Sequence, residues 1–122
     1  MRLYKTRERE QGDNIMILKV ATDYTKTPGG RFISEGPYSG QDFREKFLYP
    51  KFEEAIKKDE ELLVDLDGGY GYATSFLEEA FGGLARQTKN PRVLDIKIKS
   101  DDEEGLIPRI RDYIQNGLKT SK

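Results

Sequence analysis

Two adjacent hydroxyl residues, Thr74 and Ser75, follow a glycine-rich turn and open an amphipathic helical pattern within Leu62–Leu84 (LLVDLDGGYGYATSFLEEAFGGL). A helix that begins there directs unpaired backbone N–H groups and the positive end of its dipole toward these hydroxyls. Such a position suits an anion or a phosphorylated side chain. The candidate chemistry is therefore phosphorylation of Thr74 or, as a second choice, of Ser75.

The same residues also have structural interpretations. Ser75 and Glu78 form the pattern Ser-Phe-Leu-Glu, which is typical of a capping box, and the glycines would then only let the chain leave the strand sharply. The two interpretations are compatible, because a capping hydroxyl can also be modified. A nucleotide loop is not predicted, since Gly69-x-Gly71 lacks the third glycine of the dinucleotide fingerprint and no Gly-Lys-Ser/Thr follows.

Two carboxylates, Asp65 and Asp67, flank Leu66 and point to one face of a strand or its end. Paired carboxylates can bind Mg²⁺ or act as acid and base. This leaves an alternative function open: a small-anion, nucleotide or metal-binding domain, or an enzyme, that uses the Asp65–Ser75 loop. We expect the simpler role, in which both carboxylates accept hydrogen bonds from the glycine turn or from neighbouring N–H groups.

The composition excludes several classes of function. The 122 residues contain neither cysteine nor histidine, so disulfides, thiol nucleophiles and Ser-His-Asp catalysis are impossible within this chain. The 21 basic and 22 acidic side chains give no electrostatic signature of nucleic-acid binding. No apolar run is long enough to cross a membrane. A cytoplasmic, bacterial-type protein is therefore the default expectation, and no cofactor or metal site is predicted.

The elements that must position the hydroxyl pair alternate along the chain. Three segments are typical of strands: Ile15–Val20, Leu62–Leu66 and Val93–Ile98. Leu62–Leu66 is predicted to be the central strand. A short extended piece is predicted at Arg31–Ser34.

Helical periods follow Ser39, Ser75 and Leu106, and Ser39 can cap the N–H three residues along the first helix. The apolar faces predicted for the second and third helices are Phe76, Leu77, Ala80, Phe81 and Leu84, and Leu106, Ile110, Ile114 and Leu118. This alternation of strands and helices predicts an α/β domain. We place the domain at residues 15–119, after a polar arm at residues 1–14.

Three local details of the helices can also be predicted. Pro50 should end or kink the first helix near Tyr49. Gly82 and Gly83 weaken the second helix by about 1 kcal/mol each, and we expect them to permit close packing against a neighbouring strand. Ser100-x-x-Glu103 has the pattern of a capping box for the last helix.

Several phrases of the sequence resemble a STAS-like family of unknown function: Pro28–Arg31 (PGGR), Gly36–Gly40 (GPYSG), Phe43–Glu45 (FRE) and Asp67–Leu84 (DGGYGYATSFLEEAFGGL). The resemblance extends from Ile15 to the last helix. More distantly, the order of elements is similar to that of the STAS domains of bacterial anti-sigma-factor antagonists. The resemblance implies a single STAS-like domain, with a mixed sheet of four to five strands covered by helices.

In those antagonists, a turn carries Asp-Ser-Ser-Gly, and its first serine is phosphorylated by a partner kinase of the GHKL-type ATPase fold. Counted from the strand, Thr74 takes the acceptor place, but Ala73 and Phe76 replace the flanking Asp and Gly. The resemblance implies a non-enzymatic regulatory domain that binds a GHKL-type ATPase or kinase. We predict that the partner contacts Gly69, Tyr70, Gly71, Tyr72, Glu78 and Glu79, of which the two glutamates would oppose a phosphate at Thr74.

Overall fold

A computed structural model describes residues 14–120, and within them the sheet has three parallel strands. These are β1 (Ile15–Lys19), β2 (Glu61–Asp65) and β3 (Lys97–Lys99), in the spatial order β1-β2-β3. Cα pairing joins Ile17 to Leu63 and Leu63 to Lys97. The predicted central position of the second strand is confirmed.

The predicted mixed sheet of four to five strands is wrong for the described part of the chain. Arg31–Ser34, predicted to be extended, runs into a 3₁₀ turn, η1 (Ile33–Glu35). Half of Val93–Ile98 belongs to a second 3₁₀ turn, η4 (Pro91–Asp95), and β3 has only three residues, of which Lys97 and Ile98 lie in the predicted strand. Proline at the start of η4 favours a helical turn, because its φ is already close to the helical value.

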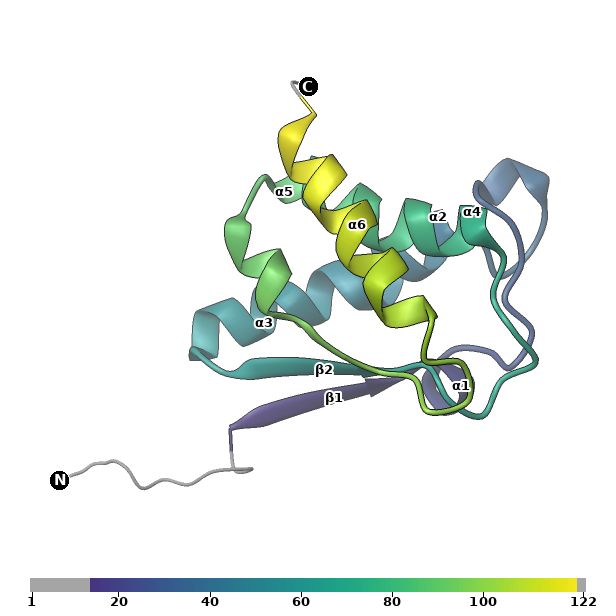
Figure 1. Ribbon diagram of the computed structural model, residues 1–122, viewed down its shortest axis with the longest axis horizontal. Coiled ribbons are helices and arrows are strands. Elements are labelled where there is room, and N and C mark those ends of the chain that lie inside the picture. Colours follow the sequence, from purple (N-terminus) through teal and green to yellow (C-terminus); the bar gives the residue numbers. More distant parts are fainter. Residues whose placement is uncertain (1–13, 121–122) are drawn as a thin grey trace, which may run out of the picture.

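The two crossover helices and α6 (Leu106–Lys119) lie on one side of the sheet, while α1 (Val20–Asp23) lies at the end of β1 (Figure 1). The short helix α1 directly follows β1, while each crossover between parallel strands is a helix interrupted by a π-helical segment. The first crossover consists of α2 (Gly40–Phe43), η2 (Arg44–Leu48) and α3 (Tyr49–Lys58); the second consists of α4 (Thr74–Leu77), η3 (Glu78–Gly82) and α5 (Gly83–Thr88); α6 ends the described fold.

The first crossover helix begins as predicted but does not end where predicted. The Ser39 hydroxyl accepts a hydrogen bond from the Asp42 N–H at 3.0 Å, which caps α2. Pro50 does not end the helix, because it occupies the first turn of α3, directly after η2. The missing N–H of proline therefore falls at the junction between the π-helical and α-helical segments.

The core lies between the sheet and the helices. Met16 and Leu18 of β1 face the helices, whereas Ile15 and Ile17 alternate onto the exposed face. The main helix residues that complete the core are Phe43, Phe52, Phe76, Phe81, Leu84, Ile110 and Ile114. The predicted apolar faces of the second and third long helices are thus the buried ones.

The last helix starts later than its predicted capping box. The Ser100 hydroxyl donates to the Glu103 carbonyl at 2.7 Å, but α6 begins only at Leu106, after Gly105, and no side chain caps it. The capping-box prediction is therefore wrong, and Ser100 instead stabilises the turn that precedes the helix. The predicted arm falls outside the described residues except for Asn14, and no helix within residues 14–120 is long and apolar enough to cross a membrane.

Candidate functional site

The hydroxyl pair lies at the start of the second crossover helix. Thr74 is the first residue of α4 and is exposed, while Ser75 is half-buried. The preceding residue, Ala73, is extended, and no side chain caps the helix. The capping box predicted for Ser75 and Glu78 is not formed, because the Glu78 carboxylate is bound by arginines instead. The Thr74 hydroxyl is therefore accessible beside uncapped backbone N–H groups.

The turn before the helix depends on glycine. Gly68 and Gly71 have φ angles of 94° and 127°, which side-chain-bearing residues rarely adopt. Gly69 packs closely on the backbone of Lys26, because a Cβ there would lie 3.2 Å from the Lys26 carbonyl oxygen. These glycines shape the turn and hold it against the preceding loop.

The two tyrosines of the turn lie in different environments. Tyr70 is 82% exposed and projects from the turn. Tyr72 packs against Phe76, with ring centroids 5.8 Å apart, and its hydroxyl donates to the Leu66 carbonyl at 2.9 Å. Burial raises the pKa of Tyr72, and the negative charge of nearby aspartates adds to this effect. Tyr70 is thus available to a partner, whereas Tyr72 fastens the turn to the strand end.

A second loop, residues 24–39, runs beside the glycine turn (Figure 1). The Lys26 carbonyl accepts a hydrogen bond from the Tyr70 N–H at 2.9 Å. Gly40, at the end of this loop, packs directly on the helix start, because a Cβ there would lie 2.4 Å from the Phe76 carbonyl oxygen. The close contact at Gly40 explains why a glycine follows Ser39 in the phrase GPYSG.

The same loop exposes apolar side chains that the sequence analysis did not select. Phe32, Ile33 and Tyr38 are 43%, 48% and 44% exposed. The signal was present, because Phe32 and Ile33 stand between the glycine-containing turns of PGGR and GPYSG. Their exposure became evident only when the predicted strand at Arg31–Ser34 proved to be a surface turn.

Glu78 and Glu79 belong to an ion network between the two π-helical segments and the loop. Arg31 binds Glu78, and Arg86 Nη1 lies 2.6 Å from Glu78 Oε2. Arg44 Nη1 donates both to Glu79 Oε2 and to the Glu79 carbonyl, each at 2.7 Å. Burial by itself would raise the pKa of Glu78, but hydrogen bonds from Arg86 and Arg31 outweigh it and lower the pKa.

The network leaves little of Glu79 accessible to a partner, since its side chain is 10% exposed. It also explains the double glycine. A Cβ at Gly83 would lie 2.2 Å from Arg44 Nη1, and a Cβ at Gly82 would lie 2.7 Å from Glu78 Oε2. The expected close packing is therefore present, but the neighbours are side chains of the ion network rather than a strand.

The strand-end carboxylates are engaged by protein donors. Asp67 accepts hydrogen bonds from Lys99 Nζ at 2.8 Å and from the N–H groups of Asp101 and Asp102 at 3.1 and 2.8 Å. Asp65 accepts a hydrogen bond from the Asp67 N–H at 2.9 Å. Within residues 14–120, no group of three or more acidic side chains is arranged to hold a metal ion. Asp67 thus fastens the loop before α6 to the end of β2, while Asp65 stabilises the turn that directly follows β2.

This role makes Asp67 a source of pH-dependent stability. The backbone N–H of Asp102 and the ammonium of Lys99 lower the pKa of Asp67 from 3.8 to about 2. Because the folded state prefers the ionised carboxylate, its contribution is complete above pH 3.8 and is lost as the pH falls toward about 2. We expect Asp67→Asn to be less stable than the parent near neutral pH, with a difference that shrinks across this interval. Urea unfolding at a series of pH values tests this, and a difference independent of pH would contradict it.

Comparison with known families places this geometry in context. The model of the STAS-like domain of unknown function (DUF4325) matches residues 39–105, more than half of the 122-residue chain. The matched range contains both π-helical segments and the whole glycine turn, while β1 and α6 lie outside it. Neither the curated proteins nor the solved structures gave a match. The extent of the family match shows that the chain belongs to the STAS-like domain family of unknown function.

Proposed function

We propose that this domain is a non-enzymatic regulatory module that binds a partner protein beside the glycine turn, under the control of phosphorylation at Thr74. The observation that carries the proposal is the exposed Thr74 hydroxyl at the first residue of the uncapped helix Thr74–Thr88. Ser75 is the weaker acceptor, because it is half-buried. A phosphate at Thr74 would meet free N–H groups and the positive end of the helix dipole.

The ion network supports this position for a phosphate. A phosphothreonine adds about −1.5 to −2 charges, and Glu78, one turn further along, would repel it. Glu78 is bound by Arg31 and Arg86, however, and Glu79 is bound by Arg44. Three arginines against two glutamates leave one excess positive charge. The domain should therefore stay folded after phosphorylation, and a partner would recognise the phosphate on its surface.

The exposed apolar side chains support a protein partner. Tyr70 projects from the glycine turn, and Phe32, Ile33 and Tyr38 project from the loop beside it. Aromatic side chains commonly provide the anchors of protein interfaces. Arg31 links this loop to the helix through its ion pair with Glu78. A partner that binds the loop would therefore also affect the helix that begins at Thr74.

A GHKL-type ATPase or kinase is the partner class that we propose, and this choice rests on the similarity to the anti-sigma-factor antagonists. The proposal places the protein in the cytoplasm, where such a kinase would meet it. The alternative of a metal-dependent enzyme has less support, because the Asp65 and Asp67 carboxylates are occupied by protein donors.

Phosphopeptide mapping of the chain from its native host tests the proposal. We expect phosphate on the peptide that contains Thr74, and loss of this signal in Thr74→Ala. Because the Thr74 hydroxyl makes no capping contact, Thr74→Ala should change the free energy of unfolding by less than about 0.5 kcal/mol. Partner capture should differ between Thr74→Ala and Thr74→Glu but not between the parent and Thr120→Ala, which alters another exposed threonine.

Two outcomes would contradict the proposal. One is an unmodified chain under every growth condition, together with equal partner capture by Thr74→Ala and Thr74→Glu. The other is loss of folding in Thr74→Ala, which would give this residue a structural role instead.

A further inference from the structure

A cleft opens at the other end of β2, away from the glycine turn, and has a volume of about 470 Å³. It forms because the pairing of β2 with β3 begins only at Leu63 and Lys97. Before that point the chain turns through η4 instead of continuing as a strand, so the first residues of β2 border the cleft. The volume lies within the usual range of small-molecule sites, about 300–1,000 Å³.

The floor of the cleft is apolar. It is formed by side chains from α3, from the start of β2 and from η4 and the residue after it: Phe52, Ala55, Ile56, Leu62, Leu94 and Ile96. Ile56 and Leu94 are the most accessible of these, while Phe52 and Leu62 are almost fully buried. Such a floor can receive a small apolar group but offers no polar contact to it.

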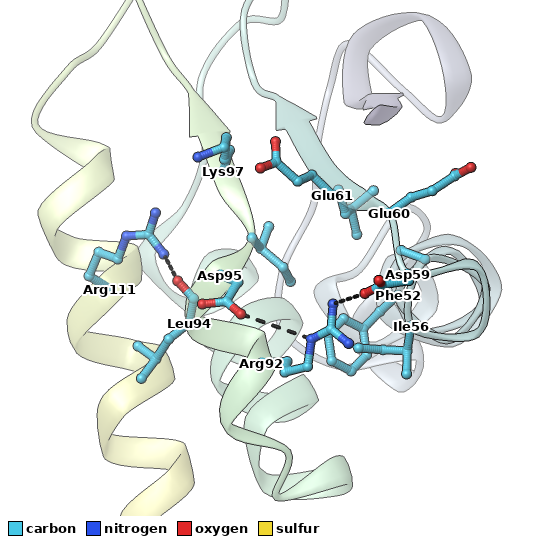
Figure 2. Close-up of a pocket in the computed structure, with 13 residues that line it drawn as sticks. Phe52, Ile56, Asp59, Glu60, Glu61, Arg92, Leu94, Asp95, Lys97 and Arg111 are labelled. Atoms are coloured by element: carbon cyan, nitrogen blue, oxygen red, sulfur yellow. Dashed lines mark hydrogen bonds and ion pairs between the residues drawn. The ribbon is translucent and has the colours of Figure 1, made fainter. Parts of the chain in front are cut away.

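The two walls carry opposite charge (Figure 2). The wall formed by the α3–β2 turn has three carboxylates, from Asp59, Glu60 and Glu61. The opposite wall, from η4, β3 and α6, has the cations of Arg92, Lys97 and Arg111 against a single carboxylate, Asp95. The walls therefore have formal charges of −3 and +2.

The ion pair that crosses the cleft is weak. Arg92 Nη2 lies 3.6 Å from Asp59 Oδ1, and the Asp59 side chain is 90% exposed. Arg111 is held by the opposite wall itself, because its Nη1 donates to the Leu94 carbonyl at 2.6 Å. A long, exposed pair is easily replaced, so a ligand can separate Arg92 from Asp59 while Arg111 stays in position.

We propose that this cleft binds a small zwitterion with an apolar side chain, of the class of a free amino acid or short peptide. The carboxylate of the ligand binds Arg92 and Arg111, whose guanidinium groups are suited to carboxylate geometry. Its ammonium group faces Asp59, and its apolar side chain rests on Ile56 and Leu94 of the cleft (Figure 2). The site is separate from the proposed partner surface, so either assignment can fail without the other.

NMR titration of the full chain with L-leucine and the dipeptide leucyl-leucine tests this inference. We expect saturable shifts of the backbone amide signals of Ile56, Leu62 and Leu94. N-acetyl-leucine retains only the carboxylate and leucinamide only the ammonium, so each should bind about fivefold more weakly or worse than leucine. Raising the salt concentration should weaken leucine binding, because the rim charges are exposed.

Variants of the wall that carries Arg92, Lys97 and Arg111 provide a second test of the inference. Arg111→Gln should weaken binding about fivefold, whereas Arg109→Gln, an exposed position of the same helix outside the cleft, should leave it unchanged. If Arg111→Gln does not fold, Arg92→Gln replaces it, because Arg92 is the other guanidinium assigned to the ligand carboxylate, and the expected direction is the same. Equal binding of leucine, N-acetyl-leucine and leucinamide would overturn the inference. So would the absence of saturable shifts with both leucine and leucyl-leucine.

Discussion

Replacing Phe81 with alanine should lower the free energy of unfolding by about 3–5 kcal/mol. Phe81 lies within the π-helical segment η3 and is fully buried. Its neighbours along the buried helix face are Leu77, Ala80 and Leu84. Truncation removes most of a large buried ring and leaves a cavity that close-packed neighbours fill only in part.

Chemical unfolding of the purified domain measures this effect. Tyr70→Ala is the matched control, because it also removes an aromatic ring but from a position that is 82% exposed. We expect this control to stay within about 0.5 kcal/mol of the parent. Equal stability of the two variants would mean that the face of the helix turned toward the core has been wrongly assigned.

Replacing Glu79 with alanine should lower the free energy of unfolding by about 3 kcal/mol. The side chains of Glu79 and Arg44 are only 10% and 13% exposed, so the pair has little solvent screening. Removing the carboxylate leaves the Arg44 guanidinium in a poorly hydrated space between two helices. The Arg44 Nε already lacks a hydrogen-bond partner within the described residues, which limits how the arginine can adjust.

Two further variants make this prediction specific. Glu54→Ala breaks an exposed ion pair with Lys58 and should leave stability nearly unchanged. The double variant Arg44→Met and Glu79→Met should recover most of the loss, because apolar side chains of similar length avoid the cost of an unpaired buried charge. A strongly destabilised double variant, together with a mild Glu79→Ala, would show that the pair contributes through packing rather than charge. All free energies come from the same chemical unfolding experiment.

The ion network also joins the π-helical segments of the two crossover helices. Arg44 is the first residue of η2, and it binds both the carboxylate and the carbonyl of Glu79 in η3. Wider helical turns leave some backbone carbonyls free to accept other donors, and they recur at functional sites. In this domain the two segments meet through one arginine, which links the first crossover helix to the helix that begins at Thr74.

Much of the architecture followed from local patterns. Apolar runs predicted the strands at Ile15 and Leu62, and the apolar period from Phe76 to Leu84 predicted the buried helix face. The Ser39 cap was also predicted, because its hydroxyl only has to reach an N–H group three residues along the chain. Such features depend on contacts between near neighbours in sequence, which residue spacing determines almost completely.

The predictions that failed concern residues that can form hydrogen bonds or packing contacts with several different segments of the chain. Glu78 was expected to cap its own helix, but Arg31, 47 residues away, and Arg86 bind it instead. The apolar alternation at Val93–Ile98 was expected to form a strand throughout, yet only its last two residues lie in β3, and η4 buries Val93. Local sequence offers each group several partners of similar energy, and tertiary packing selects among them.

The amino-acid sequence by itself determined the order of strands and helices, the glycine turn and the place of Thr74 at the start of a helix. Only the tertiary structure decided that Glu79 is buried against Arg44 and that a charged cleft opens beside β2. It also decided that Tyr70 is exposed while Tyr72 packs against Phe76. The physical reason is distance along the chain. Backbone preferences act within a few residues, whereas burial and charge pairing depend on segments that meet only in the folded protein.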